Sequence, residues 1–380
     1  MGTGKIVGQD FNQGGVGLPF HGRGRNQHLV GSVGQYEDFF FFGVRFDRHL
    51  NFHGTYPNIF PFMALYTKLS RSQIVRLASL FDLPPPKKIR GVLEGTVNTF
   101  YALSYPGQIY FLKIDEVGSR TRLDREITVF KRLQKIKSRL GFDVPLPLKA
   151  KNGKYFVPFK NRFALIFTEV ADRPAIKPNA RQLVAMGGAL GALHRATHKI
   201  PLPPHRFHLQ EQERIYRQIG RQLKKRYPTV YKQEAFTLAW LKANRPAGIP
   251  QGLIHGDLFP ENIHFKEGRL QGIVDFESAG SGEFLFDIAA ALHACCHDGR
   301  RFSIPKSKAL LKGYARSRPL SLREQKRLGY FLVYAANRFL LTRLRDFALK
   351  KGKIATKTYR DFREYFRRFD EIPEFTRALG

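Results

Sequence analysis

The sequence is poor in cysteine and in acidic residues, and it has no long apolar run. Its two cysteines, Cys295 and Cys296, are neighbours at the end of an apolar segment that begins at Ile288. Neighbouring cysteines rarely bridge each other, so a disulfide-stapled fold is excluded and a reducing, cytoplasmic compartment is expected. No apolar stretch approaches the roughly 20 residues of a membrane span, and the N-terminus lacks the pattern of a secretory signal. We therefore expect a globular protein without a membrane partner.

The shortage of acidic residues leaves a large positive charge. The chain has 64 Lys and Arg residues against 31 Asp and Glu residues, which gives a net charge of +33. Residues 1–62 contribute five basic and four acidic side chains, so the excess lies almost entirely in residues 63–380. Such a charge is typical of proteins that bind nucleic acids or anionic membranes. No RNA-binding motif or basic stripe with interleaved aromatic residues accompanies it. We expect a basic solvated surface that attracts small anionic ligands rather than a nucleic-acid partner.

Residues 1–62 differ in composition from the rest of the chain. They hold 12 of the 34 glycines and the run Phe39 to Phe42, and they show no sustained helical or strand period. We expect them to be a poorly ordered extension or a region outside the working protein. A regular sequence begins at Met63, and its pattern favours strands over residues 63–170 and helices over residues 171–380.

The helix and strand signals after Met63 follow one another in a consistent order. The capping-box pattern from Ser70 to Gln73 predicts a short helix after it. In the first part, strands are expected over residues 91–103, 108–114, 155–158 and 162–168, with a helix over 122–140. In the second part, helices are expected over residues 181–197, 210–226, 232–244, 306–317, 322–351 and 359–369, with a β interruption at 253–276. The predicted fold class is α+β, with a small β-rich N-terminal lobe and a larger helical C-terminal lobe, which is the two-lobe arrangement of kinases.

The strongest chemical signal is the segment from His255 to Asn262. Phosphoryl transfer needs a carboxylate that positions the attacking hydroxyl and accepts its proton, and Asp257 is the candidate for this role. His255 is the second candidate catalytic residue, and we expect it to fix the loop by hydrogen bonding. Asn262, five residues after Asp257, can offer an amide oxygen to Mg²⁺. This spacing equals that of the kinase catalytic loop.

Two further aspartates follow this loop. Asp275 comes directly after an apolar strand that ends at Val274, so its carboxylate is expected beside Asn262 as the second Mg²⁺ ligand. Asp287 lies at the start of the next predicted helix. There it is expected either to cap that helix or to brace the catalytic loop, and we favour the brace.

The N-terminal part supplies a candidate nucleotide site. Lys113 ends the second hairpin strand between apolar residues, where it can bind the α- and β-phosphates of ATP, and Glu126 on the following helix can hold that lysine. The segment that contains Gly95 and Asn98 can drape over the phosphates, although it is not a GxGxxG loop. A lysine and three oxygen ligands in this order predict an ATP- and Mg²⁺-dependent kinase that acts on a small hydroxylated molecule.

These residues resemble the signature of the aminoglycoside phosphotransferase/choline kinase-like superfamily and, within it, the bacterial homoserine kinases. The resemblance runs from Met63 to about Asp346. Besides the catalytic loop it includes the segments 93–99, 268–276, 310–314 and 338–346. It implies a kinase-like fold and transfer of the ATP γ-phosphate to the hydroxyl of L-homoserine, which gives O-phospho-L-homoserine on the path to threonine. Three positions depart from the homoserine kinase pattern, namely Lys113, Gly256 and Glu277.

The sequence is compatible with several acceptors and does not identify which one is phosphorylated. A carboxylate acceptor such as homoserine would be bound by an arginine, and position in the chain makes Arg343 and Arg345 the candidates. Choline, aminoglycosides and amino sugars are alternative acceptors, but cationic acceptors usually require acidic pockets and this chain has few acids. A basic binding protein with a degenerate kinase fold is a third reading, although all the catalytic positions are filled.

Overall fold

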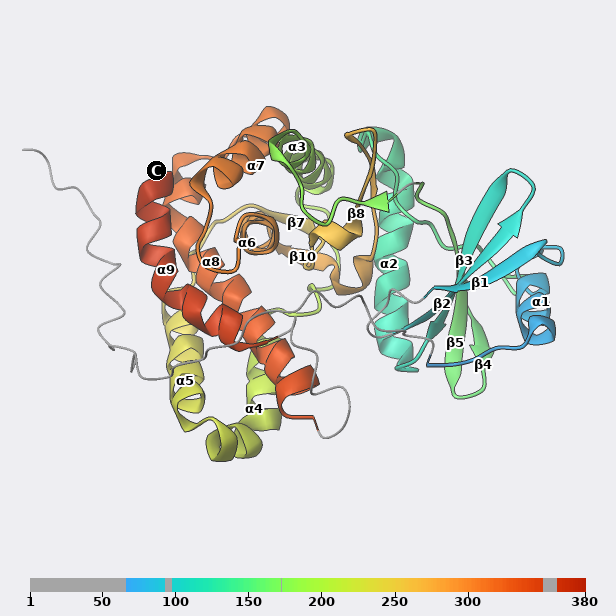
Figure 1. Cartoon of the computed structure of the whole chain (residues 1–380), viewed down its shortest axis with the longest axis horizontal. Helices are drawn as coiled ribbons and strands as arrows, with labels where there is room; N and C mark the ends of the chain where they lie inside the picture. Colours follow the sequence, from blue (N-terminus) through green and yellow to red (C-terminus); the bar gives the residue numbers. More distant parts are fainter. Residues whose placement is uncertain (1–65, 93–97, 172, 351–360) are drawn as a thin grey trace, which may run out of the picture. The chain divides into compact units, whose positions relative to one another are not determined.

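The computed structural model describes residues 66–92, 98–171, 173–350 and 361–380 (Figure 1). These residues belong to one unit of the chain, which spans residues 51–380. The extension 1–62 and the candidate phosphate-loop residue Gly95 lie outside the described residues, so the predictions made for them stay predictions.

The first part forms an antiparallel sheet of five strands in the order β1-β2-β3-β5-β4. Its strands are β1 (Lys88–Val92), β2 (Thr99–Tyr105), β3 (Gln108–Asp115), β4 (Val157–Phe159) and β5 (Arg162–Thr168). The turn between β2 and β3 is closed by Gly107, whose φ of 70° is in the left-handed region that glycine adopts readily. The prediction of a single strand over residues 91–103 was wrong. This segment is split between two antiparallel neighbours, β1 and β2, because the chain reverses direction between them.

Two helices accompany this sheet. Helix α1 (Arg71–Ser79) begins at Ser70, which forms the predicted capping box with Gln73, and it packs its apolar face into the core of the sheet. Helix α2 (Arg120–Ile136) begins at Ser119, whose hydroxyl accepts a hydrogen bond from the backbone N–H of Arg122. The apolar residues that recur at helical spacing in the sequence are therefore the ones that α1 and α2 bury.

The second part is helical around two small sheets. Its helices are α3 (Ala180–Thr197), α4 (Leu209–Arg226), α5 (Pro228–Ala243), α6 (Phe284–Cys295), α7 (Ile304–Ser317), α8 (Leu322–Arg343) and α9 (Arg363–Leu379). One sheet pairs β7 (Gln251–Ile254) with β10 (Gly280–Glu283). The other joins β6 (Arg173–Pro174), β8 (Ile263–Lys266) and β9 (Arg269–Ile273). The predicted α+β fold class, with a β-rich lobe before a helical lobe, is confirmed.

The last two helices differ from their predicted lengths. The helix expected over 322–351 is α-helical only to Arg343, and a π-helical turn, Leu344–Ala348, follows it. The final helix was expected to end at Phe369, but α9 continues through Pro373 to Leu379. Proline discourages a helix by removing a backbone donor, so a sequence pattern underestimates such a helix when tertiary packing supports it.

Helix α6 forms the centre of the helical lobe (Figure 1). It packs against α3, α7 and α8, and nearly all of its side chains are buried, which is typical of a core helix that is apolar on every side. Cys295 at its end and Cys296 after it are both buried and free. No helix in the described part of the chain is long and apolar enough to cross a membrane.

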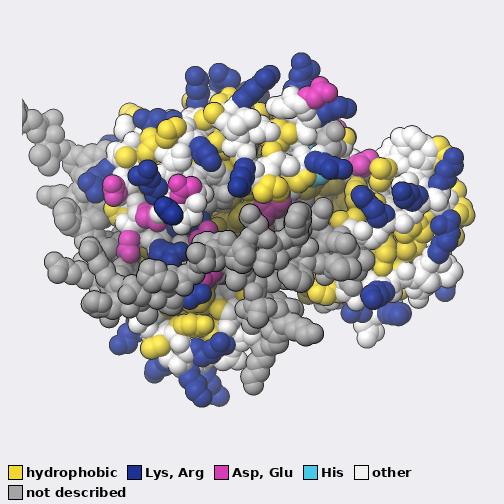
Figure 2. Space-filling model, in the orientation of Figure 1, with side chains coloured by type: hydrophobic (Ala, Val, Ile, Leu, Met, Phe, Trp, Pro, Cys, Tyr) yellow, Lys and Arg dark blue, Asp and Glu magenta, His cyan; other side chains and the backbone are white. Residues whose placement is uncertain are grey.

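The positive charge is spread over the molecule. Figure 2 shows Lys and Arg side chains over most of the visible described surface, with Asp and Glu much rarer. The basic side chains of the described residues do not gather into one stripe on this face.

Helices α3 and α7 cross at unusually close range because of glycines (Figure 1). A Cβ atom added at Gly187 would collide with the backbone carbonyl oxygen of Leu310, and one added at Gly313 would collide with that of Val184. At Gly188 the nearest atom, the carbonyl oxygen of Gly313, lies 3.6 Å from the added Cβ, which is an ordinary contact. The two neighbouring glycines of α3 therefore differ only in what faces them.

This difference predicts opposite effects for the same substitution. Gly187→Ala should lower stability by about 1–3 kcal/mol, because the helix backbones must move apart. Gly188→Ala should leave stability unchanged or raise it by up to about 1 kcal/mol, because alanine is the better helix former. Thermal melting of both variants checks this. Equal melting temperatures for the two variants would contradict the close crossing.

A buried acid in α5 predicts a pH-dependent stability. Glu234 is fully buried, and neither of its carboxylate oxygens has a hydrogen-bond partner among the described residues. Burial raises the pKa of Glu234 well above its usual value. The native state then keeps a proton that the unfolded chain has lost, so stability falls as pH rises above the unfolded pKa, by up to about 1.4 kcal/mol per pH unit.

Glu234→Gln removes this titration. We expect its stability relative to the wild-type chain to increase steadily between pH 5 and pH 8, as measured by urea unfolding at several pH values. A stability difference that does not change with pH would show that Glu234 is ionised in the native state.

Candidate active site

The loop between β7 and β8 is held by a carboxylate from α6. Asp287 accepts hydrogen bonds from the backbone N–H groups of His255, at 2.6 Å, and Gly256, at 2.7 Å. Its Oδ2 also lies 3.2 Å from Nε2 of His194, whose Nδ1 is 2.9 Å from the hydroxyl of Tyr314. Asp287 thus holds the loop from the first turn of α6, whose N-cap position is occupied by Glu283 and not by Asp287.

Asp287 is kept ionised by these donors. Burial by itself would raise the pKa of this carboxylate, but the hydrogen bond and charge of His194, the charge of His255 and the N–H of Gly256 lower it below its usual value. A charged acceptor forms stronger hydrogen bonds to backbone N–H groups than a neutral one does. The loop is therefore anchored by charge-assisted bonds inside the protein core.

His255 fixes the other side of the loop. Its Nε2 lies 2.9 Å from the carbonyl oxygen of Val274, and its Nδ1 accepts the backbone N–H of Asp257 at 3.2 Å. Both ring nitrogens are used in this way, so the imidazole joins the loop to the chain just before Asp275.

The glycine of the loop is required by its backbone. Gly256 has a φ of 76°, and a Cβ atom at this position would lie 2.9 Å from the carbonyl oxygen of Ser278. A side chain would therefore be both strained and crowded in this conformation.

Asp257 forms an ion pair with Arg338 of α8. Oδ1 of Asp257 lies 3.1 Å from an Nη atom of Arg338, and the aspartate side chain remains 29% exposed, so it can still reach a substrate. Arg338 is buried, with its guanidinium over the rings of Phe207, at 4.2 Å, and Phe339, at 4.0 Å. Aromatic stacking fixes the arginine, and the arginine in turn fixes the carboxylate.

Asn262 and Asp275 come together at the end of β9. The backbone N–H of Val274 donates to the carbonyl oxygen of Asn262 at 2.9 Å, which ties the two segments side by side. The amide nitrogen of Asn262 donates to the carbonyl of Asp257 at 2.9 Å, so its amide oxygen is the atom that can face a metal. Asp275 is in the left-handed conformation, with φ of 64°.

The donor set at this point fits a divalent cation. Although the side chain of Asp275 is exposed to solvent, the protein around it and the charges of Glu277 and Asp257 raise its pKa to about 7, which is the expected effect of clustered carboxylates without a counter-cation. Within the described ranges, no group of three acidic, histidine or cysteine side chains could by itself hold a metal. Mg²⁺ usually takes only one or two of its ligands from the protein, and water and phosphate oxygens supply the others. The carboxylate of Asp275 and the amide oxygen of Asn262 match this small number of protein ligands.

Lys113 is buried between two carboxylates. Its Nζ lies 2.8 Å from Glu126 of α2 and 2.7 Å from Glu277, which follows Asp275 by two residues. Burial acts to lower the pKa of Lys113, but the charges of Glu126 and Glu277 outweigh it and raise the pKa above its usual value. The lysine is therefore charged and is connected both to α2 and to the segment after Asp275.

Glu277 is the centre of a cluster that the sequence did not reveal. Besides Lys113, it accepts a hydrogen bond from the amide of Asn98 and lies 3.6 Å from Arg122. Burial would raise the pKa of Glu277, but Lys113, Arg122 and Arg206 lower it to about 2. Asn98 also accepts the backbone N–H of Glu116 at 3.1 Å. The only sequence signal for Glu277 was its departure from the homoserine kinase pattern, which coincides with the departure at Lys113.

The two arginines expected at the acceptor lie in different surroundings. Arg343 pairs with Glu364, donates to the carbonyl of Asp361 at 2.8 Å and lies over the ring of Tyr365, so its guanidinium is occupied by α9 and the turn before it. Arg345 forms a two-point pair with its neighbour Asp346, at 2.8 and 2.7 Å.

The arginine beside Asp257 is Arg338, which the sequence analysis did not select. The signal that could have found it is its position in α8, where it is a single charge inside a run of buried residues from Leu328 to Leu341. A buried charge in such a run usually has a partner, and here the partner is Asp257.

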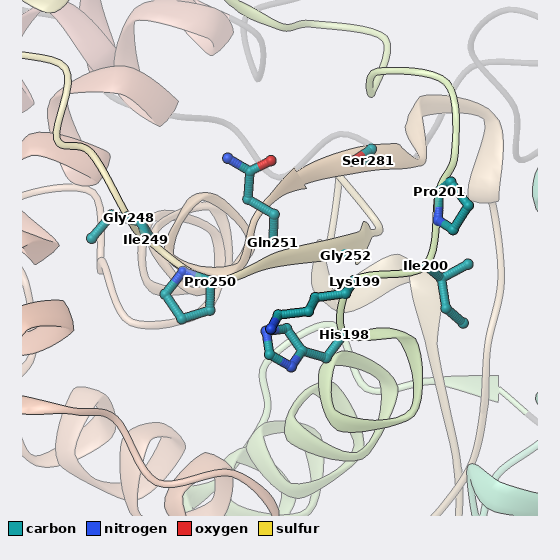
Figure 3. A pocket seen from close by; sticks show the side chains of 10 residues that line it. All are labelled: His198, Lys199, Ile200, Pro201, Gly248, Ile249, Pro250, Gln251, Gly252 and Ser281. Atoms are coloured by element: carbon teal, nitrogen blue, oxygen red, sulfur yellow. The ribbon is translucent and has the colours of Figure 1, made fainter.

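A hollow of about 510 Å³ lies elsewhere in the helical lobe (Figure 3). It is lined by His198, Lys199, Ile200, Pro201, Gly248, Ile249, Pro250, Gln251, Gly252 and Ser281. None of these is a predicted site residue. The candidate site is therefore defined by its residues and their contacts rather than by this hollow.

Comparison with known proteins agrees with this geometry. Residues 88–320 match the model of the phosphotransferase enzyme family. The chain is 30% identical to the homoserine kinase of Mesorhizobium japonicum over 83% of this chain and 97% of that protein. It is 31% identical to the homoserine kinase of Nitrobacter hamburgensis over 75% of this chain and 87% of that protein.

Solved structures with the same fold are also kinases. A microcompartment-associated aminopropanol kinase matches with a TM-score of 0.59 and 14% identity over 82% of this chain and 99% of that one. An amicoumacin kinase in complex with AMP-PNP and Ca²⁺ matches with a TM-score of 0.58 and 19% identity over 74% of this chain and 89% of that one. With residues 88–320 matching the family model, the chain belongs to the phosphotransferase enzyme family.

Proposed function

We propose that this chain is a homoserine kinase, which transfers the γ-phosphoryl group of ATP to the hydroxyl group of L-homoserine in the presence of Mg²⁺. The observation that carries the proposal is the position of Asp257. Its carboxylate is held by Arg338 at 3.1 Å, in a loop whose Asn262 is bonded to the strand end that precedes Asp275. Phosphoryl transfer requires a carboxylate that accepts the proton of the acceptor hydroxyl, and oxygen atoms beside it that bind a metal ion.

The residues divide the work between donor and acceptor. Lys113 is charged and buried, and it would bind phosphate oxygens of the nucleotide in exchange for part of its pairing with Glu277. Asn262 and Asp275 would hold Mg²⁺, which when bound neutralises charge on the β- and γ-phosphates. Asp257 orients the acceptor hydroxyl and takes its proton, while His255 and Asp287 keep the loop in place.

The charge around Asp257 supports an acceptor that carries a carboxylate. Arg338 touches Asp257, and the guanidinium groups of Arg206 and Arg345 are near enough to influence Arg338 electrostatically. Even with Asp346 paired to Arg345, three arginines stand against two aspartates here, which suits the carboxylate of homoserine. The same site would repel choline or an aminoglycoside, because these acceptors are cationic. The names of the relatives that cover most of the chain point to the same acceptor.

The proposal predicts the outcome of an acceptor screen. ADP formation should be fastest with L-homoserine, and it should be at least about tenfold slower with choline, kanamycin and methylthioribose at equal concentrations. The product should be O-phospho-L-homoserine, identified by mass spectrometry. Asp257→Asn should lower kcat by about 10²–10⁴, because it removes the proton acceptor but keeps the shape of the side chain.

Two controls separate the possible results. Asp124→Asn, a substitution on the exposed side of α2, should keep wild-type activity, which excludes a general effect of lost charge. Turnover of another acceptor but not of homoserine would overturn the acceptor and leave the kinase proposal standing. Residual ADP formation that is equal in wild-type and Asp257→Asn proteins would overturn both proposals.

A further inference from the structure

The loop between α3 and α4 is fastened to the segment after Asp275. The backbone N–H of Arg206 donates to the carbonyl oxygen of Ser278 at 3.0 Å, and that of His205 donates to Ser281 at 2.9 Å. Arg125 of α2 donates to the carbonyl of Pro204 in the same loop. The loop thus contacts both the helix that carries Glu126 and the chain that carries Asp275 and Glu277.

Glycine permits this close approach. A Cβ atom at Gly280 would lie 2.6 Å from Cα of His205, and one at Gly282 would lie 3.0 Å from its imidazole ring. The glycines of β10 therefore let the loop lie directly on the strand. This contact places the next residue, Arg206, beside the site.

The side chain of Arg206 is near groups of both the nucleotide part and the acceptor part of the proposed site. Its guanidinium is over the ring of Phe207 at 5.0 Å, and Arg338, the partner of Asp257, is over the same ring at 4.2 Å. Its charge interacts with Glu277 and Arg122 on the nucleotide side, and with Arg345 and Asp257 on the acceptor side.

Arg206 has no ion pair with any described residue, since no carboxylate among residues 66–92, 98–171, 173–350 and 361–380 lies within 4.0 Å of it. Its other basic neighbours are engaged: Lys113 with Glu126 and Glu277, Arg122 with Asp115, and Arg338 with Asp257. The side chain of Arg206 is partly exposed, so an anionic ligand can reach its guanidinium. In the proposed site, a cation near both Glu277 and Asp257 is placed to meet a phosphoryl group that moves from the nucleotide to the acceptor.

We propose that Arg206 is a catalytic residue that donates hydrogen bonds to the phosphoryl group while this group moves from the nucleotide to the acceptor. The proposal rests on the proposed kinase function but not on the identity of the acceptor. In the transfer, the bond from the γ-phosphorus to the β–γ bridging oxygen breaks and the bond to the acceptor oxygen forms. The acceptor proton passes to Asp257, and ADP leaves with the bridging oxygen. Charge is spread over the three oxygens of the group in transit, and a guanidinium placed there stabilises it more than it stabilises ground-state ATP.

The test compares Arg206→Gln and Arg206→Lys with the full-length wild-type chain. Arg206→Gln should lower kcat by about 10²–10³, as expected for the loss of one preorganised donor, while the KM values for ATP and the acceptor stay within about threefold. Arg206→Lys should recover part of the loss. Arg217→Gln is the matched control, because Arg217 is an exposed arginine of α4 that pairs only with Glu213 among the described residues, and its kcat should equal that of the wild type.

A binding measurement provides a readout without turnover. ADP with Mg²⁺ and fluoroaluminate mimics the group in transit, and it should bind more weakly to Arg206→Gln than to the wild type, by at least about tenfold. ADP with Mg²⁺ alone should bind equally to both proteins. Because no acceptor is added, this result does not depend on whether homoserine is the acceptor.

Three outcomes would overturn the proposal. An increase of tenfold or more in KM for the acceptor with unchanged kcat would assign Arg206 to acceptor binding instead. Equal binding of the fluoroaluminate complex by both proteins would exclude contact with the group in transit. In the third outcome, both Arg206→Gln and Arg206→Lys lose kcat and melt at a lower temperature, while fluoroaluminate binding per folded molecule does not change. This result would assign Arg206 a structural role.

Discussion

The carboxylate of Asp287 forms the interaction on which the rest of the site depends. It is fully buried in the central helix of the helical lobe, and its two oxygens accept the backbone N–H groups of His255 and Gly256. A loop has few internal hydrogen bonds of its own, so its shape must be imposed from outside. Asp287 imposes it at the base, and the imidazole of His255 joins the same loop to the carbonyl of Val274. Asp257 and Asn262 then project from a backbone whose position is fixed at both ends.

Electrostatics connects this loop with the β-rich lobe. Lys113 and Glu277 form a buried pair across the two parts, and Glu126 and Arg122 enclose it. A carboxylate surrounded by a lysine, an arginine and an amide occupies a setting that would also suit a phosphate oxygen. In this chain, Glu277 therefore neutralises the cations that the proposed function assigns to the nucleotide. Both Lys113 and Glu277 depart from the homoserine kinase pattern, and their direct contact explains why the two departures belong together.

Much of the local structure could be predicted because its causes are local. The capping box at Ser70, the turn at Gly107 and the apolar faces of α1 and α2 depend on residues within a few positions of one another. The spacing of His255, Asp257 and Asn262 is also local, and so is the strand that precedes Asp275. The order of these signals was enough to predict a two-lobe kinase fold.

The rest depends on contacts between distant segments. Arg338 and Asp257 are far apart in the sequence, and their pairing follows from the way α8 packs against the loop. Glu277 and Arg206 become interpretable only when β10 and the loop before α4 lie side by side. Position in the chain alone favoured Arg343, but α9 engages its guanidinium, and this helix extends further than its proline suggested. Sequence periodicity contains no information on such long-range partners.

The most direct measurement is the kcat of Asp287→Asn, per folded molecule, with the acceptor that the wild-type chain phosphorylates. Asparagine has nearly the same shape, but it lacks the charge and can accept with only one oxygen, so the loop loses a charge-assisted bond. The account predicts that kcat falls by about 100-fold or more, which corresponds to about 2.7 kcal/mol of transition-state stabilisation. It also predicts that the affinity for ATP without Mg²⁺ changes little, since Lys113 and Glu126 lie in the other lobe and only the proposed metal ligand Asn262 belongs to the loop. A kcat within about twofold of the wild-type value in a folded Asp287→Asn protein would contradict the claim that this carboxylate positions the catalytic loop.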